Sequence, residues 1–242
     1  MDATEIRQLV ALERTHWWYR ERRAILRREL RALGRPGRAL DVGAAGGGNT
    51  EVLVEQGWDA TATDSSPVAV EIARERGLRA VPADARGLPF ESASVDLVTA
   101  FDVLEHVEQD HLVTEEIARV LRPGGHTLIA VPCDMELWSP HDDAVGHVRR
   151  YSRDSLVRVV EKAGLQVERV WSWNVLLRPL IARHRRGSTG SDLRRMPAVI
   201  NAGLSAVVIA ERYLPVQSRR GVTLFLRARR DESPFGHKVS LC

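Results

Sequence analysis

The chain of 242 residues is long enough for one large domain with a substantial core. Hydrophobic residues make up 44% of it and charged residues 28%, a composition typical of a globular protein in water. Lysine and arginine total 35 against 32 acidic residues, and the basic pairs are scattered along the chain, which argues against a nucleic-acid-binding protein.

The N-terminal segment, residues 4–33, has two apolar stripes that predict one helix or two, with a break near His16. Three consecutive aromatic residues, Trp17, Trp18 and Tyr19, follow the break and precede several bases. Trp17 and Trp18 could anchor the helix on the core, because aromatic side chains bury large areas. Alternatively, His16, Trp17 or Tyr19 could cover a ligand pocket.

From residue 38 onward, short apolar segments alternate with helical patterns that end at glycine. The predicted strands are Arg38–Val42, Asp59–Asp64, Leu78–Val81, Ser94–Ala100 and His126–Pro132. Asn49 or Thr50 could cap the helix after the first strand. Strands separated by helices of about ten residues predict βαβ units and a doubly wound α/β sheet. The carboxyl ends of its strands would meet at one crevice, where ligands bind in such sheets.

The second half of the chain keeps the alternation only in part. Ser152 can cap a helix that reaches Lys162, followed by strands at 165–170 and 222–229. Residues 174–220 form a predicted helical insert with an arginine-rich patch, which covers the pocket or forms a dimer surface. The expected organisation is an N-terminal helical cap (1–34), a main domain (35–230) that contains this insert, and a disordered tail (231–242).

The loop after the first strand has four glycines in six residues, beginning at Gly43. Glycine lets a backbone turn tightly and approach a ligand closely. A dinucleotide fingerprint needs glycine at its third position, where this chain has Ala45. S-adenosylmethionine needs an acid after the second strand to hold its ribose diol and a polar group after the third to hold its adenine. Asp64 ends the second predicted strand, and Asp84 follows the third. Asp64 alone would suit NAD, but the combination favours S-adenosylmethionine.

These segments together resemble the class I S-adenosylmethionine-dependent methyltransferases. The resemblance covers residues 38–131 in the family's order and is carried by Leu40–Asn49, Ala62–Pro67, Ala83–Phe90, Phe101–Val107 and Leu121–Gly125. It implies a Rossmann-like sheet of seven mostly parallel strands, with an antiparallel last strand and flanking helices. It also implies cofactor contacts from Asp41, Gly43, Ala44, Gly47, Asp64, Ser65, Asp84, Ala85 and Phe101. Ala45 departs from the family's usual glycine.

The flanking segments are similar to a subgroup of small-molecule methyltransferases that act in natural-product or cell-surface pathways. The similarity rests on the aromatic and basic segment 16–23 and on a Gly-His-x-Arg-Arg-Tyr motif at 146–151. From this subgroup we expect substrate contacts from His16, Trp17, Tyr19, Arg150 and Tyr151. An ion pair from Arg150 to Asp142, Asp143 or Glu161 is the alternative.

Methyl transfer to oxygen or nitrogen requires removal of a proton, a task that suits histidine. His106 follows the fourth predicted strand, and His141 and His147 follow the fifth, so all three are candidate bases. Asp102, Glu105 and His106 would share one face of a helix. Such a set could bind a divalent metal, as similar residues do in ubiquinone-pathway O-methyltransferases. A metal is possible here but not favoured over a structural role.

The favoured function is therefore methylation of a small molecule in natural-product or other secondary metabolism, with oxygen as acceptor slightly ahead of nitrogen or carbon. Some relatives use the same fold for cyclisation or rearrangement, which stays an alternative. A nicotinamide-dependent oxidoreductase and an RNA methyltransferase are weaker alternatives, the latter because no basic patch is evident. The chain has only two cysteines and neither an apolar membrane span nor a signal segment, which favours a cytoplasmic location. We expect a monomer or homodimer that binds a small-molecule substrate and no nucleic acid.

Overall fold

A twisted sheet of seven strands forms the centre of the molecule in this computed structural model, which describes residues 3–185 and 196–232. The strand order is β3-β2-β1-β4-β5-β7-β6, and β7 is antiparallel to both of its neighbours. The strands are β1 (Arg38–Val42), β2 (Asp59–Asp64), β3 (Arg79–Pro82), β4 (Val95–Phe101), β5 (Leu121–Pro132), β6 (Leu165–Trp173) and β7 (Thr223–Arg230). The predicted doubly wound architecture with an antiparallel last strand is confirmed.

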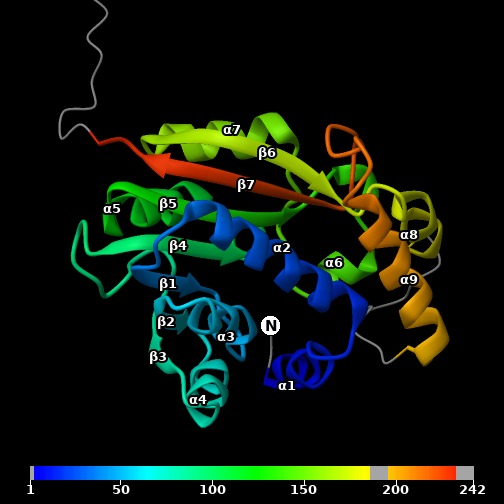
Figure 1. Cartoon of the computed structure of the whole chain (residues 1–242), viewed down its shortest axis with the longest axis horizontal. Coiled ribbons are helices and arrows are strands. Elements are labelled where there is room, and N and C mark those ends of the chain that lie inside the picture. The colour runs from blue at the N-terminus through cyan, green and yellow to red at the C-terminus, as the bar shows by residue number, and fades with distance from the viewer. Residues whose placement is uncertain (1–2, 186–195, 233–242) are drawn as a thin grey trace, which may run out of the picture.

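Helices cover both faces of this sheet (Figure 1). Side chains alternate along each strand, so Ala39 and Leu97 are buried on one face and Leu40 and Val98 on the other. The first face packs against α2 (Trp17–Leu33), α3 (Gly48–Glu55) and α4 (Pro67–Glu75). The second face packs against α5 (Asp110–Val120) and α7 (Arg153–Lys162). Burial on both faces explains why the strands of β1, β4 and β5 are so apolar.

The N-terminal segment forms two helices, α1 (Ala3–Leu12) and α2, which break at the predicted position. The side chain of His16 caps α2 by accepting a hydrogen bond from the backbone N–H of Trp18. Trp17 is buried, and its ring lies 6.2 Å from that of Trp173 on β6. The packing of Trp17 therefore agrees with the interpretation that it anchors the helix on the core.

Two local predictions are wrong. The segment between β3 and β4 contains no helix and is instead a loop closed by an isolated bridge between Asp84 and Gly87. The helix after the glycine loop starts at Gly48 and is capped by Gly47, not by Asn49 or Thr50. Thr50 instead donates its hydroxyl to a strand residue described below. The predicted Ser152 cap is confirmed, since its hydroxyl accepts from the backbone N–H of Ser155 at 3.1 Å.

The predicted insert contains two helices, α8 (Arg178–Arg185) and α9 (Ala198–Glu211), which lie at one edge of the molecule (Figure 1). The side-chain amide of Asn201 accepts from Trp17 N–H at 2.8 Å and donates to the carbonyl of Thr15, which ties α9 to the α1–α2 junction. Most of the predicted tail, residues 233–242, lies outside the described residues. Within the described ranges, no helix is long and apolar enough to cross a membrane.

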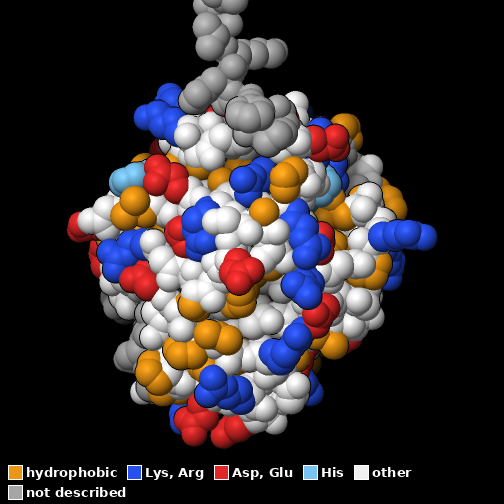
Figure 2. Space-filling model, turned by 90° about the vertical axis from the view of Figure 1, so that its left-hand side faces the viewer, with side chains coloured by type: hydrophobic (Ala, Val, Ile, Leu, Met, Phe, Trp, Pro, Cys, Tyr) orange, Lys and Arg blue, Asp and Glu red, His pale blue; other side chains and the backbone are white. Residues whose placement is uncertain are grey.

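The face at the amino ends of the parallel strands carries interleaved basic and acidic side chains (Figure 2). Apolar side chains are scattered between them. This is the mixed surface that the dispersed charges of the sequence predict.

Candidate functional site

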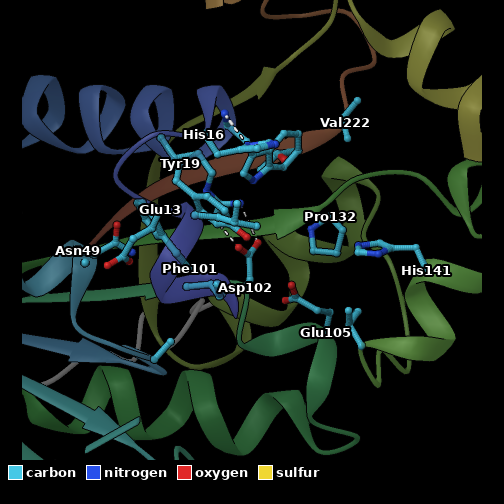
Figure 3. A pocket seen from close by; sticks show the side chains of 18 of the residues that line it. Glu13, His16, Tyr19, Asn49, Phe101, Asp102, Glu105, Pro132, His141 and Val222 are labelled. Carbon is cyan, nitrogen blue, oxygen red and sulfur yellow. Dashed lines mark hydrogen bonds and ion pairs between the residues drawn. The ribbon is translucent and has the colours of Figure 1, made fainter. Parts of the chain in front are cut away.

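A cavity of about 320 Å³ lies at the carboxyl ends of β1, β4 and β5, roofed by α1, α2 and α8. Figure 3 shows side chains reaching it from several elements: Glu13, His16 and Tyr19 from the N-terminal helices, and Phe101, Asp102 and Pro132 from the strand ends. Ten of the predicted cofactor, substrate and catalytic residues line it. They are Gly43, Ala44, Phe101, His16, Trp17, Tyr19, His106, His141, His147 and Arg150.

The glycine loop between β1 and α3 forms one wall of this cavity. Gly43 and Gly47 have φ angles of 65° and 84°, in the left-handed region that favours glycine. A Cβ on Gly43 would lie 2.5 Å from Val103, so the loop is also packed tightly. Ala45 has a φ of 46°, which means that this alanine takes the conformation in which the family uses glycine.

Replacing Ala45 with glycine should therefore relieve backbone strain. A left-handed conformation costs an L-residue roughly 1–2 kcal/mol, while glycine adds up to about 1 kcal/mol of unfolded-state entropy. We expect Ala45→Gly to leave the free energy of unfolding unchanged or to raise it by up to about 1 kcal/mol. The matched variant Ala44→Gly, at a buried neighbour without positive φ, should lower it. Urea denaturation of both variants measures the difference; equal losses would contradict the strain argument.

Asp41 lies beneath the loop and does not line the cavity. It is fully buried, and its two oxygens accept hydrogen bonds from the hydroxyls of Thr50 at 2.7 Å and Thr99 at 2.6 Å. Burial raises the pKa of Asp41 to about 6, although these hydrogen bonds oppose the shift. The carboxylate thus joins β1 to α3 and β4, so the structure gives it a supporting position instead of the predicted direct contact.

Asp64 and Asp84 follow neighbouring strands outside the cavity, along the edge formed by β2 and β3. Asp64 is half-buried and accepts from the backbone N–H groups of Ala45 at 2.9 Å and Ser66 at 2.8 Å. Asp84 is half-exposed, and the hydrogen bonds and charge of Arg86 lower its pKa. Gly47, Ser65 and Ala85 also lie outside the lining of the cavity. The predicted cofactor residues therefore follow one edge of the sheet but extend beyond the cavity.

Two charged residues that the sequence interpretation missed lie against the glycine loop. Glu13 is buried. A Cβ added to Gly48 would lie only 2.2 Å from its Oε2, so the carboxylate packs directly against the loop. Arg23 lines the cavity, lies 3.9 Å from the Glu13 carboxylate and also donates to the Glu13 carbonyl. Burial raises the pKa of Glu13 despite the opposing charges of Arg76 and Arg23. The sequence signal for Arg23 was its place among the basic residues that follow Trp17 and Trp18.

Arg22 lines the cavity next to Asp102. Its guanidinium donates to both carboxylate oxygens of Asp102, at 3.0 and 2.8 Å. It also lies within 6 Å of the ring centres of Trp18, Phe101 and Phe225, at distances that allow cation–π attraction. Asp102 has a φ of 59° and is engaged by this pair, so it is not free to join the metal set predicted with Glu105 and His106.

The histidines meet at the far side of the cavity. His147 lies 2.8 Å from Asp142 through Nδ1, and its Nε2 is 3.9 Å from an oxygen of Glu105. Since a carboxylate can only accept, Nδ1 of His147 carries the proton of this contact, and Nε2 is the nitrogen that faces Glu105. His106 contacts the carbonyl of Gly146 through Nδ1 at 3.2 Å, and burial, with the charge of His147, lowers its pKa to about 4. In its neutral form, each imidazole therefore has Nε2 as its acceptor nitrogen.

Glu105 is fully buried beside these rings, and neither of its oxygens has a hydrogen-bond partner. Burial and the charge of Asp102 raise its pKa well above the usual range. Ligand atoms of Glu105, His106 and His147 all lie within 4.8 Å of one another, which would suit a divalent cation. The function proposed below requires no metal.

The Gly-His-x-Arg-Arg-Tyr motif holds this corner together. Arg150 is buried and donates to both oxygens of Asp142, at 2.8 and 2.9 Å. Tyr151 is buried outside the cavity lining and donates its hydroxyl to Asp110 at 2.7 Å. The ion pair weighed as the alternative for Arg150 is the arrangement found. Arg150 lines the cavity while it makes this ion pair, so its substrate contact stays a prediction, whereas Tyr151 lies outside the lining.

Comparison with known proteins decides the family. Residues 15–170 match the model of a methyltransferase domain family, which is well over half of the chain. The chain belongs to the class I S-adenosylmethionine-dependent methyltransferases. Its glycine loop and the acids after β2 and β3 are the residues through which this family resemblance was predicted.

Curated relatives of this methyltransferase share only part of their length with it. It is 33% identical over 139 residues to the biotin biosynthesis bifunctional protein BioHC of Cellvibrio japonicus, covering 53% of this chain and 28% of that protein. It is 35% identical over 95 residues to the ubiquinone biosynthesis O-methyltransferase of Bordetella avium, covering 36% of this chain and 39% of that protein. The chain thus spans less than half of the length of these two relatives.

A solved structure shares the fold. The N-methyltransferase NodS of Bradyrhizobium japonicum, in complex with S-adenosyl-L-homocysteine, superposes with a TM-score of 0.58 at 18% identity and covers 88% of this chain and 87% of its own. At this identity the likeness concerns the fold of this methyltransferase and not its acceptor.

Proposed function

We propose that the chain methylates a small molecule of natural-product or other secondary metabolism, with oxygen favoured as the acceptor atom over nitrogen or carbon. One observation carries the proposal. A histidine oriented by a buried carboxylate faces a cavity next to the family's cofactor edge. A hydroxyl acceptor needs such a base, because the neutral oxygen is a poor nucleophile.

The residues at the cofactor edge fit S-adenosylmethionine in chemistry and in position. Arg23 lines the cavity beside the glycine loop and would bind the methionine carboxylate, a pairing that arginine favours. Asp64 keeps free acceptor capacity for a ribose diol, and Asp84 is exposed for the adenine amino group. The adenosine would therefore lie along β2 and β3, and the methionine end would enter the cavity. When bound, the cofactor supplies a methyl carbon activated by its sulfonium.

The acceptor would lie between that methyl carbon and His147. Its hydroxyl would donate a proton to Nε2 of His147, and the deprotonated oxygen would then be the nucleophile for the methyl group that the cofactor supplies. The Asp142 carboxylate holds the ring in the correct tautomer and stabilises the imidazolium that forms. Arg150 in turn fixes Asp142 through two hydrogen bonds. His106 and His141 line the same cavity and would contact the acceptor.

Replacing His147 with alanine tests this assignment. We expect kcat for methyl transfer to fall about 10²–10⁴-fold, the usual contribution of a general base. The affinity for S-adenosylmethionine, measured by calorimetry, should stay within about threefold, because His147 lies across the cavity from the glycine loop. Activity is measured as S-adenosylhomocysteine formed with a panel of small phenols, hydroxy acids and amines.

The exposed His111 provides the matched control, and His111→Ala should keep full activity. Full activity in His147→Ala, together with a large loss in His106→Ala, would transfer the base to His106. Product mass separates the reaction classes, since methylation adds one methyl group. A product of unchanged mass formed without S-adenosylhomocysteine would support cyclisation instead.

A further inference from the structure

The insert helix α9 is apolar on both sides: Leu204, Val207 and Val208 pack against the core, and the side that faces away from the protein is apolar as well. The side of α9 that faces the protein holds Asn201, the buried Val208 and the buried Glu211, whose carboxylate accepts from the N–H of Leu176 at 2.9 Å. The opposite side, from Val199 to Ile209, is exposed and carries no charged side chain. A surface helix normally carries charged and polar side chains on its outer side.

Exposed apolar side chains concentrate on this part of the molecule. Among the described residues, twelve large hydrophobic side chains are exposed, and eight of them belong to the insert. They are Leu176, Leu180, Met196, Val199, Ile200, Ile209, Tyr213 and Leu214. Val199 and Tyr213 are 84% and 82% exposed. A gathering of this kind marks a site of interaction, whereas single exposed apolar residues do not.

The same segment is basic. Its described residues contain six arginines and one acid, Glu211, which is buried. Arg178 and Arg220 pair with Asp134 and Glu136, and Arg212 pairs with Glu21. Arg183 on α8 and Arg219 after α9 are exposed, and neither forms an ion pair with any described residue. In Figure 1, α8, α9 and the turn that follows α9 lie together at one edge of the molecule.

We propose that this edge docks on an anionic lipid bilayer, with α9 lying in the plane of the interface. An apolar helix face flanked by arginine and tyrosine has the composition of interfacial helices. With 14 residues at about 1.5 Å each, α9 is too short to span the hydrocarbon core but suits that orientation. Charge selects the bilayer over a second copy of this chain, because two such edges would bring arginines against arginines, whereas anionic headgroups attract them.

The test uses the full chain and vesicles of phosphatidylcholine with or without phosphatidylglycerol, followed by sedimentation. We expect binding to the anionic vesicles, weaker binding to the neutral ones, and release by salt. The double variant Val199→Glu/Tyr213→Glu should no longer sediment. Arg183→Glu and Arg219→Glu should each weaken binding at least about fivefold. Val54→Glu, at an apolar side chain on α3 that is 50% exposed, is the matched control and should bind normally.

Calorimetry with S-adenosylmethionine and circular dichroism of each variant separate loss of docking from loss of folding. Absence of binding to anionic vesicles would overturn the proposal, as would binding that Val199→Glu/Tyr213→Glu leaves unchanged. A lipid-free dimer in light scattering that the same double variant dissociates would assign the surface to a second copy instead. None of these outcomes depends on which acceptor the cavity binds.

Discussion

Asp142→Asn is expected to lower the free energy of unfolding by about 3–5 kcal/mol, the usual cost of removing one partner from a buried ion pair. The substitution keeps the volume of the side chain but removes the charge that faces Arg150, whose guanidinium is fully buried. It also removes the acceptor for Nδ1 of His147. Urea denaturation followed by circular dichroism measures the loss.

The neighbouring Asp143 is exposed, and Asp143→Asn should change stability by less than about 0.5 kcal/mol. Burial alone would raise the pKa of Asp142, but hydrogen bonds from His147 and Arg150 outweigh it and hold the pKa at about 2. A lowered pKa means that the carboxylate stabilises the fold above about pH 4 and loses this effect as the pH falls toward 2. The gap between wild type and Asp142→Asn should therefore narrow over that range; a constant gap would contradict the assigned charge.

Asp64→Ala should weaken the binding of S-adenosylmethionine about 100-fold or more. The variant loses the acceptor for the ribose diol, and hydrogen bonds to a charged group contribute about 1.5–3 kcal/mol each. It also frees the backbone N–H of Ala45, which Asp64 holds at 2.9 Å, so the glycine loop loses a support. Isothermal titration calorimetry at fixed pH and salt measures the affinity.

Asp59→Ala, at the exposed start of the same strand, provides the control and should bind the cofactor normally. Asp64→Asn keeps one acceptor oxygen and should fall between the two. Unchanged affinity in a folded Asp64→Ala variant would remove Asp64 from the cofactor site.

The order of strands and helices could be predicted because each element has its own local signal. β1, β4 and the second half of β5 are short apolar runs, and a glycine follows α3, α4 and α7. The missing helix between β3 and β4 had no such signal, because residues 83–94 are neither periodic nor capped. The start of α3 was misplaced since Gly47 caps it through backbone conformation alone, whereas capping rules look for a side chain.

The only site residues that a general rule could predict are those at the carboxyl ends of parallel strands, because these ends meet at one edge of the sheet. Asp64, Asp84 and Phe101 follow from that rule. Pairings between distant segments do not. Arg22 engages Asp102 from 80 positions away, a contact that the local pattern of Asp102, Glu105 and His106 does not reveal. The alignment of His147 with Glu105 likewise depends on three segments that meet only in the folded chain.

The packing of α1 on the glycine loop has a consequence for which sequences this fold can accept. A Cβ on Gly46 would lie 2.3 Å from Val10, and one on Gly48 would lie 2.2 Å from Glu13. A side chain at either position would therefore need Val10 or Glu13 to shift. Any substitution at 46 must be matched by a smaller residue at 10, so the loop and the N-terminal helix can change only together. Grafting this loop into a relative that lacks α1 would remove the contact with Val10, but Ile72 on α4 would still lie 3.3 Å from a Cβ at position 46.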